Sequence, residues 1–166
     1  MSQGHNILDR FRLDGKVAFV TGASGGLGSA MAEAVAEAGA DLIVISRQRE
    51  RLERIVKYAE ATGRRCVPVA CDLGDPAQVR SAIRVADEEF GHLDILINAA
   101  GTTYRAHPED FPEQAWDEVL ALNLKSVFIA CQEAGRRMIA QRSGKIINVA
   151  SMLSFSGGIL VPAYSA

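Results

Sequence analysis

A glycine-rich stretch, TGASGGLG at residues 21–28, joins an apolar run to a segment with helical periodicity. The run before it, KVAFVT at residues 16–21, is typical of a buried strand, and the apolar residues after it recur at the spacing of one helix face. Glycines allow a tight turn and close approach of a phosphate, and a helix start presents free N–H groups. The stretch therefore predicts a strand–turn–helix unit that binds a pyrophosphate. Its spacing differs from the common G-x-G-x-x-G, and a turn without a ligand is the alternative.

The alternation of apolar runs and helical patterns continues along the chain. Strands are predicted at residues 16–21, 41–46, 66–70, 93–98 and 145–149. Helices are predicted at residues 27–38, at 52–59 with a stop near Gly63, at 76–90 after an N-cap at Asp75, and at 116–138 with a kink near Asn123. Residues 102–111 are predicted as a loop. Near-continuous apolar strands are typical of a parallel sheet that is covered on both faces. Right-handed crossovers then predict an α/β fold, a Rossmann-type doubly wound parallel sheet in the order 3-2-1-4-5 that is truncated after strand five.

Length and charge restrict the class of protein. The chain has 166 residues and a formal net charge of −2, which argues against a nucleic-acid partner because phosphate binding needs a basic surface. We expect an N-terminal tail at residues 1–12 and one dinucleotide-binding domain at residues 13–166, incomplete at its C-terminus. No apolar stretch approaches the roughly 18 residues that span a membrane. No signal-peptide core is found at the N-terminus, so a cytoplasmic protein without membrane contact is expected.

The cysteines and histidines show no metal-ligand spacing. Cys66, Cys71 and Cys131 form no CxxC pair, and we expect reduced thiols that pack as small hydrophobes. The histidines lie far apart in the sequence, so no metal site is predicted; they are His5, His92 and His107.

Polar residues or glycines follow every predicted strand. After the second strand come Ser46 and Arg47, and after the third come Asp72 and Leu73. The fourth is followed by Asn98-Ala99-Ala100-Gly101, and the fifth by Ala150-Ser151. Since ligands of such sheets bind outside the carboxyl ends of the strands, these residues are the expected site.

In combination, these motifs resemble the short-chain dehydrogenase/reductase family. The resemblance runs from about Leu13 to Ala166 and rests on five features. They are T-G-x-x-x-G-x-G at residues 21–28, Asp72 after the third strand, N-A-A-G at residues 98–101, Asn123 within A-L-N-L, and Ser151 followed thirteen residues later by Tyr164.

The resemblance implies an NAD(P)-dependent oxidoreductase that transfers a hydride between the nicotinamide and a secondary alcohol or ketone. By resemblance, Ser151 bonds the substrate oxygen, Tyr164 is the general acid/base, and Asn123 holds a water in a proton relay. A homo-oligomer, by family resemblance a tetramer, is also implied. The implied cofactor-binding residues are Gly22, Ser24, Gly26, Leu27, Gly28, Ser46, Arg47, Asp72, Leu73, Asn98, Ala99 and Gly101.

The end of the second strand indicates the cofactor. NAD-preferring sites usually place an acidic side chain there, where it accepts from the ribose 2′-hydroxyl. This chain instead has Ser46 followed by Arg47, which favours NADP(H) through a charge-assisted contact with the 2′-phosphate. The alternative is that Arg47 belongs to a solvated basic face formed with Arg49, Arg51, Arg54 and Lys57.

Two stretches indicate the substrate. Residues 101–105 with residues 111–116 resemble gluconate 5-dehydrogenases, and residues 151–164, SMLSFSGGILVPAY, resemble 2-deoxy-D-gluconate 3-dehydrogenases. Both classes act on sugar acids, whose carboxylate needs a cation. Arg105 is the candidate, with a surface-loop arginine as the alternative reading.

The chain departs from the family pattern near its last residue. The family places a lysine four residues after the tyrosine, followed by further strands and a substrate loop, whereas Ala166 follows Tyr164 by two residues. We therefore expect the 166-residue chain alone to be inactive. Two other readings stay open: a non-catalytic dinucleotide-binding module, and a fragment of a longer enzyme. An intact mass measurement separates them.

Overall fold

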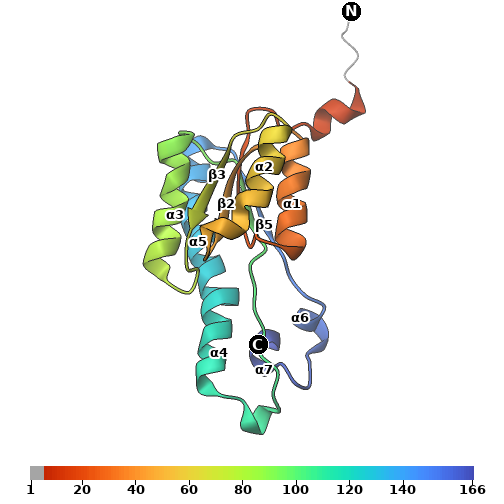
Figure 1. Ribbon diagram of the computed structural model, residues 1–166. Coiled ribbons are helices and arrows are strands. Elements are labelled where there is room, and N and C mark those ends of the chain that lie inside the picture. The colour runs from red at the N-terminus through yellow and green to blue at the C-terminus, as the bar shows by residue number, and fades with distance from the viewer. Residues whose placement is uncertain (1–5) are drawn as a thin grey trace, which may run out of the picture.

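The computed structural model describes residues 6–166, which form a five-stranded parallel sheet in the order β3-β2-β1-β4-β5. This order confirms the predicted doubly wound topology (Figure 1). The strands are β1 Val17–Thr21, β2 Asp41–Ser46, β3 Cys66–Ala70, β4 Ile95–Asn98 and β5 Lys145–Asn148. The helices are α1 Gly26–Glu37, α2 Glu53–Ala61, α3 Pro76–Glu89, α4 Glu113–Leu120, α5 Ser126–Gln141, α6 Leu153–Ser156 and α7 Pro162–Ser165.

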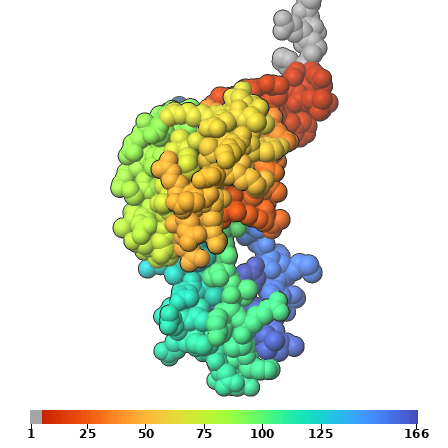
Figure 2. Space-filling view, viewed as in Figure 1, coloured from red at the N-terminus to blue at the C-terminus, as the bar shows by residue number. Residues whose placement is uncertain are grey.

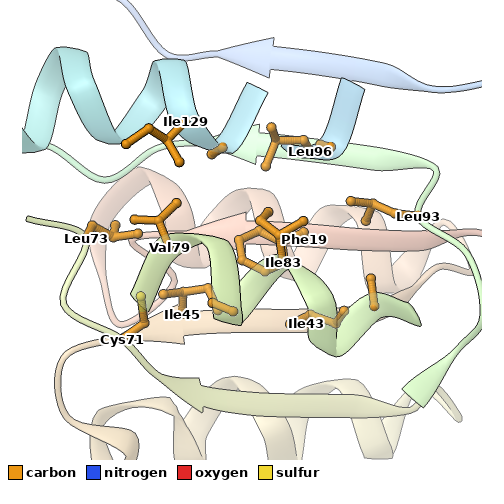
Figure 3. Packing of buried hydrophobic residues seen from close by; sticks show 14 of the residues in the cluster. Phe19, Ile43, Ile45, Cys71, Leu73, Val79, Ile83, Leu93, Leu96 and Ile129 are labelled. Atoms are coloured by element: carbon orange, nitrogen blue, oxygen red, sulfur yellow. The ribbon is translucent and has the colours of Figure 1, made fainter. Parts of the chain in front are cut away.

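Helices cover both faces of the sheet because successive side chains of each strand point to opposite faces. On β1, Val17 and Phe19 pack in the cluster that includes α3 and α5, while Ala18 and Val20 pack in the cluster that includes α1 and α2. Figure 3 shows the first of these clusters, where Ile83 from α3 lies against Phe19. The strands are therefore apolar on both faces, which explains their continuous hydrophobic runs.

The fourth strand begins later than predicted, at Ile95 instead of Leu93. Asp94 is buried and its side chain accepts hydrogen bonds from the Val17 backbone nitrogen at 3.0 Å and from Lys16 Nζ at 2.9 Å. Gln141 bonds both backbone polar groups of Leu93, at 3.1 and 3.0 Å. A side chain thus satisfies the Leu93 backbone, whereas the Asp94 nitrogen already donates to the Val17 carbonyl at 3.0 Å and the Asp94 carbonyl accepts from the Lys145 nitrogen at 2.8 Å. A hydrophobic pattern does not reveal this boundary.

The predicted kink near Asn123 is confirmed. A π-helical turn at Ala121–Lys125 separates α4 from α5. Such turns insert one extra residue into a helix and interrupt its regular bonding. Asn123 therefore projects from a distorted part of the helix toward the loop that follows β4, where Thr102 contacts it.

A smaller lobe lies beyond the carboxyl end of the sheet (Figures 1 and 2). It contains α4, the segment from Gly101 to Pro112 with a 3-10 turn at Pro108–Asp110, and the two short helices α6 and α7, which the sequence did not predict. The Ala106 backbone nitrogen donates to the Leu160 carbonyl at 3.1 Å, so the chain after β4 is joined to the chain after β5. The lobe places both segments beside the predicted site.

The two edges of the sheet differ. On β3, pairing through the Arg65 carbonyl and the Cys71 nitrogen leaves Pro68 at a position that faces outward. Proline has no N–H group there, so this edge is poorly suited to pairing with another strand. On β5, the bonds of Lys145 and Val149 to β4 direct the Ile146 amide outward, and the side chains of Ile146 and Ile147 are 39% and 47% exposed.

The described part of the predicted N-terminal tail contains a 3-10 helix, Ile7–Phe11, with no buried residue. Residues 1–5 of that tail lie outside the described residues. None of the helices in residues 6–166 combines the length and the apolar composition that a membrane span requires. Burial raises the pKa of the Cys71 thiol to about 11 and that of Cys66 to about 12, so both thiols stay protonated at neutral pH.

Candidate active site

Two glycines of the β1–α1 turn are required by packing within the protein. Gly22 has φ +71°, and a Cβ there would lie 2.8 Å from the Ala100 backbone nitrogen. A Cβ on Gly28 would lie 2.3 Å from the Gly22 carbonyl oxygen. The Thr21 hydroxyl accepts from the backbone nitrogens of Ala99 and Ala100, at 3.1 Å each. These contacts hold the glycine turn against the loop that follows β4.

The other glycines of the turn face open space. Gly26 has φ +55°, and a Cβ on Gly25 or Gly26 would meet no atom within 4 Å. The N-terminus of α1 has no side-chain cap, whereas Asp75 caps α3 by accepting from the Ala77 nitrogen at 2.8 Å. The first N–H groups of α1 are therefore available, next to the exposed side chains of Ser24 and Leu27. A phosphate fits this position without displacing a protein group.

Ser46 and Arg47 lie at the carboxyl end of β2. Ser46 is half-buried and its hydroxyl accepts weakly from the Gln48 nitrogen at 3.4 Å. Arg47 is exposed, and no ion pair with another of residues 6–166 holds it. Arg54, by contrast, pairs with Glu33 at 2.5 Å. The predicted basic face is thus partly neutralised at Arg54, while the Arg47 guanidinium is available to an anion.

Asp72 and Leu73, at the end of β3, have different surroundings. One Asp72 carboxylate oxygen accepts from the Gly74 nitrogen at 2.9 Å and so shapes the turn, and the residue is exposed. Leu73 packs its side chain in the core with Val79. Of the two predicted cofactor contacts, Asp72 has a side chain at the surface, whereas Leu73 could contribute only its backbone.

The side chain of Asn98 is buried and bonds neighbouring side chains at the end of the sheet. Its side chain is 4% exposed, and Nδ2 donates to Asn148 Oδ1 at 2.8 Å and to Cys131 Sγ at 3.5 Å. No role in bracing these strand ends was predicted for the three residues that do so, which are Thr21, Cys131 and Asn148. A signal was present, because two neighbouring apolar strands, ILIN and KIIN, both end in asparagine.

Asn123 clamps the loop that follows β4. Its Oδ1 accepts from the Thr102 nitrogen at 2.9 Å, and its Nδ2 donates to the Thr102 carbonyl at 2.8 Å. The same Oδ1 lies 3.5 Å from where a Gly101 Cβ would be. Both polar atoms of the amide thus bond the Thr102 backbone. The water-holding role of Asn123 stays a prediction, and a water would have to share these two atoms with Thr102.

Ser151, Tyr164 and Arg105 all lie at the carboxyl end of the sheet, in or beside the lobe. Ser151 follows β5, is half-buried, and accepts from the Leu153 nitrogen at 3.2 Å. Tyr164 is half-buried in α7, which contacts α4. Arg105 is exposed on the loop between the Asn123 clamp and the Ala106–Leu160 bond. His5, one of the three histidines, lies outside the described residues. Within residues 6–166, no three side chains of the metal-ligating types lie together.

The sheet order, the uncapped helix after the glycine turn and the polar strand ends define a Rossmann-type dinucleotide-binding domain. Residues 16–166 match the short chain dehydrogenase family, and the chain belongs to it.

Several curated relatives are similar over most of the chain. It is 46% identical over 163 residues to the 2-dehydro-3-deoxy-D-gluconate 5-dehydrogenase of Escherichia coli, covering 96% of this chain and 63% of the relative. The enzyme of the same name from Dickeya dadantii is 44% identical over 163 residues, with the same coverage of 96% and 63%. The chain thus spans about 63% of the length of these relatives.

Solved structures share the fold. A protein of Sinorhizobium meliloti assigned as a short-chain alcohol dehydrogenase superposes with a TM-score of 0.91 at 41% identity, over 94% of this chain and 62% of that one. One of Beutenbergia cavernae, assigned as an NAD(P)-dependent gluconate 5-dehydrogenase and solved with NADP, gives 0.87 at 34% identity over 93% and 61%. An NAD⁺-bound xylitol dehydrogenase gives 0.87 at 32% identity over 92% and 59%.

Proposed function

We propose that this chain is the dinucleotide-binding part of an NADP(H)-dependent oxidoreductase that acts on a sugar acid of the gluconate type. One observation carries the proposal: an open, uncapped helix N-terminus lies at the same end of the sheet as the exposed Arg47 and as Ser151. The family supports oxidoreduction, and the names of the E. coli and D. dadantii relatives support a 2-dehydro-3-deoxy-gluconate as the substrate.

The residues present fit the phosphates of a dinucleotide. The pyrophosphate would be held by the first N–H groups of α1, over Gly25 and Gly26, where the structure leaves open space. Arg47 would bind the 2′-phosphate, and the exposed Asp72 would accept from the adenine amino group. When bound, the nicotinamide supplies or accepts the hydride.

The remaining chemistry belongs to side chains of this chain. Ser151 would donate a hydrogen bond to the substrate oxygen, and the Tyr164 hydroxyl would give or take the proton on that oxygen. Asn123 would act by fixing the loop at Thr102, since both of its amide atoms contact that backbone. These roles rest on the family resemblance and on the common location of the residues at the carboxyl end of the sheet.

The cofactor preference is tested by Arg47→Ala in an extended chain, defined as residues 1–166 continued by the part of the E. coli relative that lies beyond the match. We expect affinity for NADPH to fall by about tenfold or more, and affinity for NADH to change less than about twofold, because only NADPH carries the 2′-phosphate that a charge-assisted contact holds. Calorimetric titration measures both affinities. Arg84→Ala, an exposed arginine on α3, is the control. Equal weakening of the two cofactors, or a wild type that prefers NADH, would refute the preference.

The substrate class is tested by Arg105→Ala in the extended chain. We expect kcat/KM for 2-dehydro-3-deoxy-D-gluconate to fall by roughly tenfold to a hundredfold, because a charged hydrogen bond to the carboxylate is lost. Turnover of the matching neutral sugar should not change. Faster turnover of neutral sugars by the wild type, together with a silent Arg105→Ala, would exclude a sugar acid.

We also propose that the protein forms homo-oligomers through α5. Three exposed apolar side chains lie along one side of this helix and the π-helical turn before it: Leu124 at 63%, Phe128 at 63% and Ile139 at 79% exposure. Such a stripe is unusual on a monomer surface. In light scattering, Phe128→Glu should lower the oligomeric mass of the extended chain, whereas Leu8→Glu in the N-terminal 3-10 helix should not. An unchanged mass for Phe128→Glu would count against this surface.

A further inference from the structure

Three side chains form a closed hydrogen-bonded cycle at the ends of β4 and β5. Asn98 Nδ2 donates to Asn148 Oδ1 at 2.8 Å and to Cys131 Sγ at 3.5 Å, and Cys131 Sγ donates to Asn148 Oδ1 at 3.6 Å. Asn98 and Asn148 are register partners in the sheet. Cys131 comes from α5 and is the only member of the cycle that lies outside the sheet.

The Cys131 thiol bonds both amides, which an apolar side chain of the same size cannot do. A thiol donates and accepts at one atom, so it satisfies the Asn98 N–H and the Asn148 oxygen together. Asparagine amides have two orientations related by a flip, and the Asn98–Asn148 bond forms only when the two amides have matching orientations. If one amide flips alone, two donors or two acceptors face each other. Cys131, which bonds both amides from α5, thus favours the matched pair over a mismatched one.

These amides lie directly before the residues of the site. Asn98 precedes Ala99 and Gly101, and Ser151 follows Asn148 by three residues. The strands are also joined here by the Val149 nitrogen, which donates to the Asn98 carbonyl at 2.9 Å. A change in this bonding therefore moves both site loops, and catalysis is sensitive to displacements of about 1 Å.

We infer that Cys131 is a positioning residue, which holds the Asn98–Asn148 amide pair and through it aligns Ser151 with the loop that follows β4. The inference rests on the proposed function, because it assigns Cys131 a role in that reaction. Cys131 itself does not contact substrate or cofactor in this account.

The test compares Cys131→Ala and Cys131→Ser in the extended chain. We expect Cys131→Ala to lower kcat about fivefold while KM for NADPH changes less than about twofold. Cys131→Ser should recover at least about half of the lost kcat, since a hydroxyl also donates and accepts. The matched control is Cys66→Ala, another half-buried cysteine whose thiol makes no hydrogen bond within residues 6–166, and its kcat should not change. Normal kcat in Cys131→Ala, no rescue by serine, or an equal loss in Cys66→Ala would each overturn the inference.

A second measurement does not depend on turnover. Side-chain amide NMR signals of Asn98 and Asn148 should shift in Cys131→Ala, and the Asn98 amide protons should exchange about tenfold faster. Cys131→Ser should restore both signals, and Cys66→Ala should leave them unchanged. If the extended chain is inactive, the proposed function fails, and these signals alone decide whether Cys131 holds the amide pair. Signals that do not respond to Cys131→Ala would overturn the inference at any level of activity.

Discussion

A polypeptide of residues 1–166 alone should reduce or oxidise substrate about a thousandfold more slowly than the extended chain. A phenol titrates roughly three pH units above neutrality, and shifting that equilibrium to pH 7 takes about 4 kcal/mol of stabilisation by a neighbouring positive charge. The residues that follow Tyr164 in this polypeptide, Ser165 and Ala166, carry no charge. In the short-chain dehydrogenase/reductase family, a lysine one helical turn after the tyrosine supplies this positive charge.

The comparison needs equal folding of the two polypeptides. Residues 1–166 expose Ile146 and Ile147 at the sheet edge and Phe155 in α6, so this polypeptide should also associate, which light scattering detects. Turnover is therefore compared per folded molecule, with the folded fraction taken from circular dichroism. Comparable turnover by the two polypeptides would show that Tyr164 acts without that charge, or that another residue is the acid/base.

Replacing Tyr164 by phenylalanine in the extended chain should lower kcat by roughly a hundredfold to ten-thousandfold. Phenylalanine keeps the ring that packs in α7 and removes only the hydroxyl that exchanges the proton. Affinity for NADPH should be unchanged, because the expected cofactor contacts lie at the ends of β1, β2, β3 and β4, whereas Tyr164 lies in α7. Steady-state kinetics with a separate cofactor titration measures both quantities.

Tyr58→Phe is the matched control. Tyr58 lies on α2, where its hydroxyl donates to Glu37, and it is far along the chain from Tyr164 and Ser151. This variant should keep wild-type kcat. A Tyr164→Phe enzyme with more than about a tenth of wild-type kcat would exclude the tyrosine as the acid/base.

The topology could be predicted from the sequence because each strand is an apolar run bounded by glycine or polar residues. β2 and β3 begin and end where the pattern placed them, and the kink at Asn123 lies where a polar residue interrupts a long helical pattern. β4 was predicted two residues too long; at Leu93 the side chain of Gln141, and not a neighbouring strand, bonds the backbone. Local hydrophobicity carries no information on such long-range contacts.

The site was harder to predict than the fold. Gly22 was predicted to bind the cofactor, and this stays a prediction; in the structure its missing side chain makes room for Ala100, and only Gly25 and Gly26 of this turn face open space. Asn98 and Asn123 were expected at the cofactor and at a water, and these roles stay predictions; in the structure, both side chains bind the protein itself. A motif gives the residue type and the place in the fold, whereas the partner of each polar atom depends on the packing of distant segments.

An NMR titration of the extended chain with NADPH tests the central claim most directly. The claim is that the open helix start after β1 and the arginine after β2 hold this cofactor. Saturable shifts are predicted for the backbone amides of Gly25, Gly26 and Leu27 and for the Arg47 side chain, with NADH producing smaller changes at Arg47. The amides of Val67 and Val69, which lie within β3 before its carboxyl end, should not respond. Shifts that leave residues 25–27 unchanged, or no saturation at all, would contradict the account.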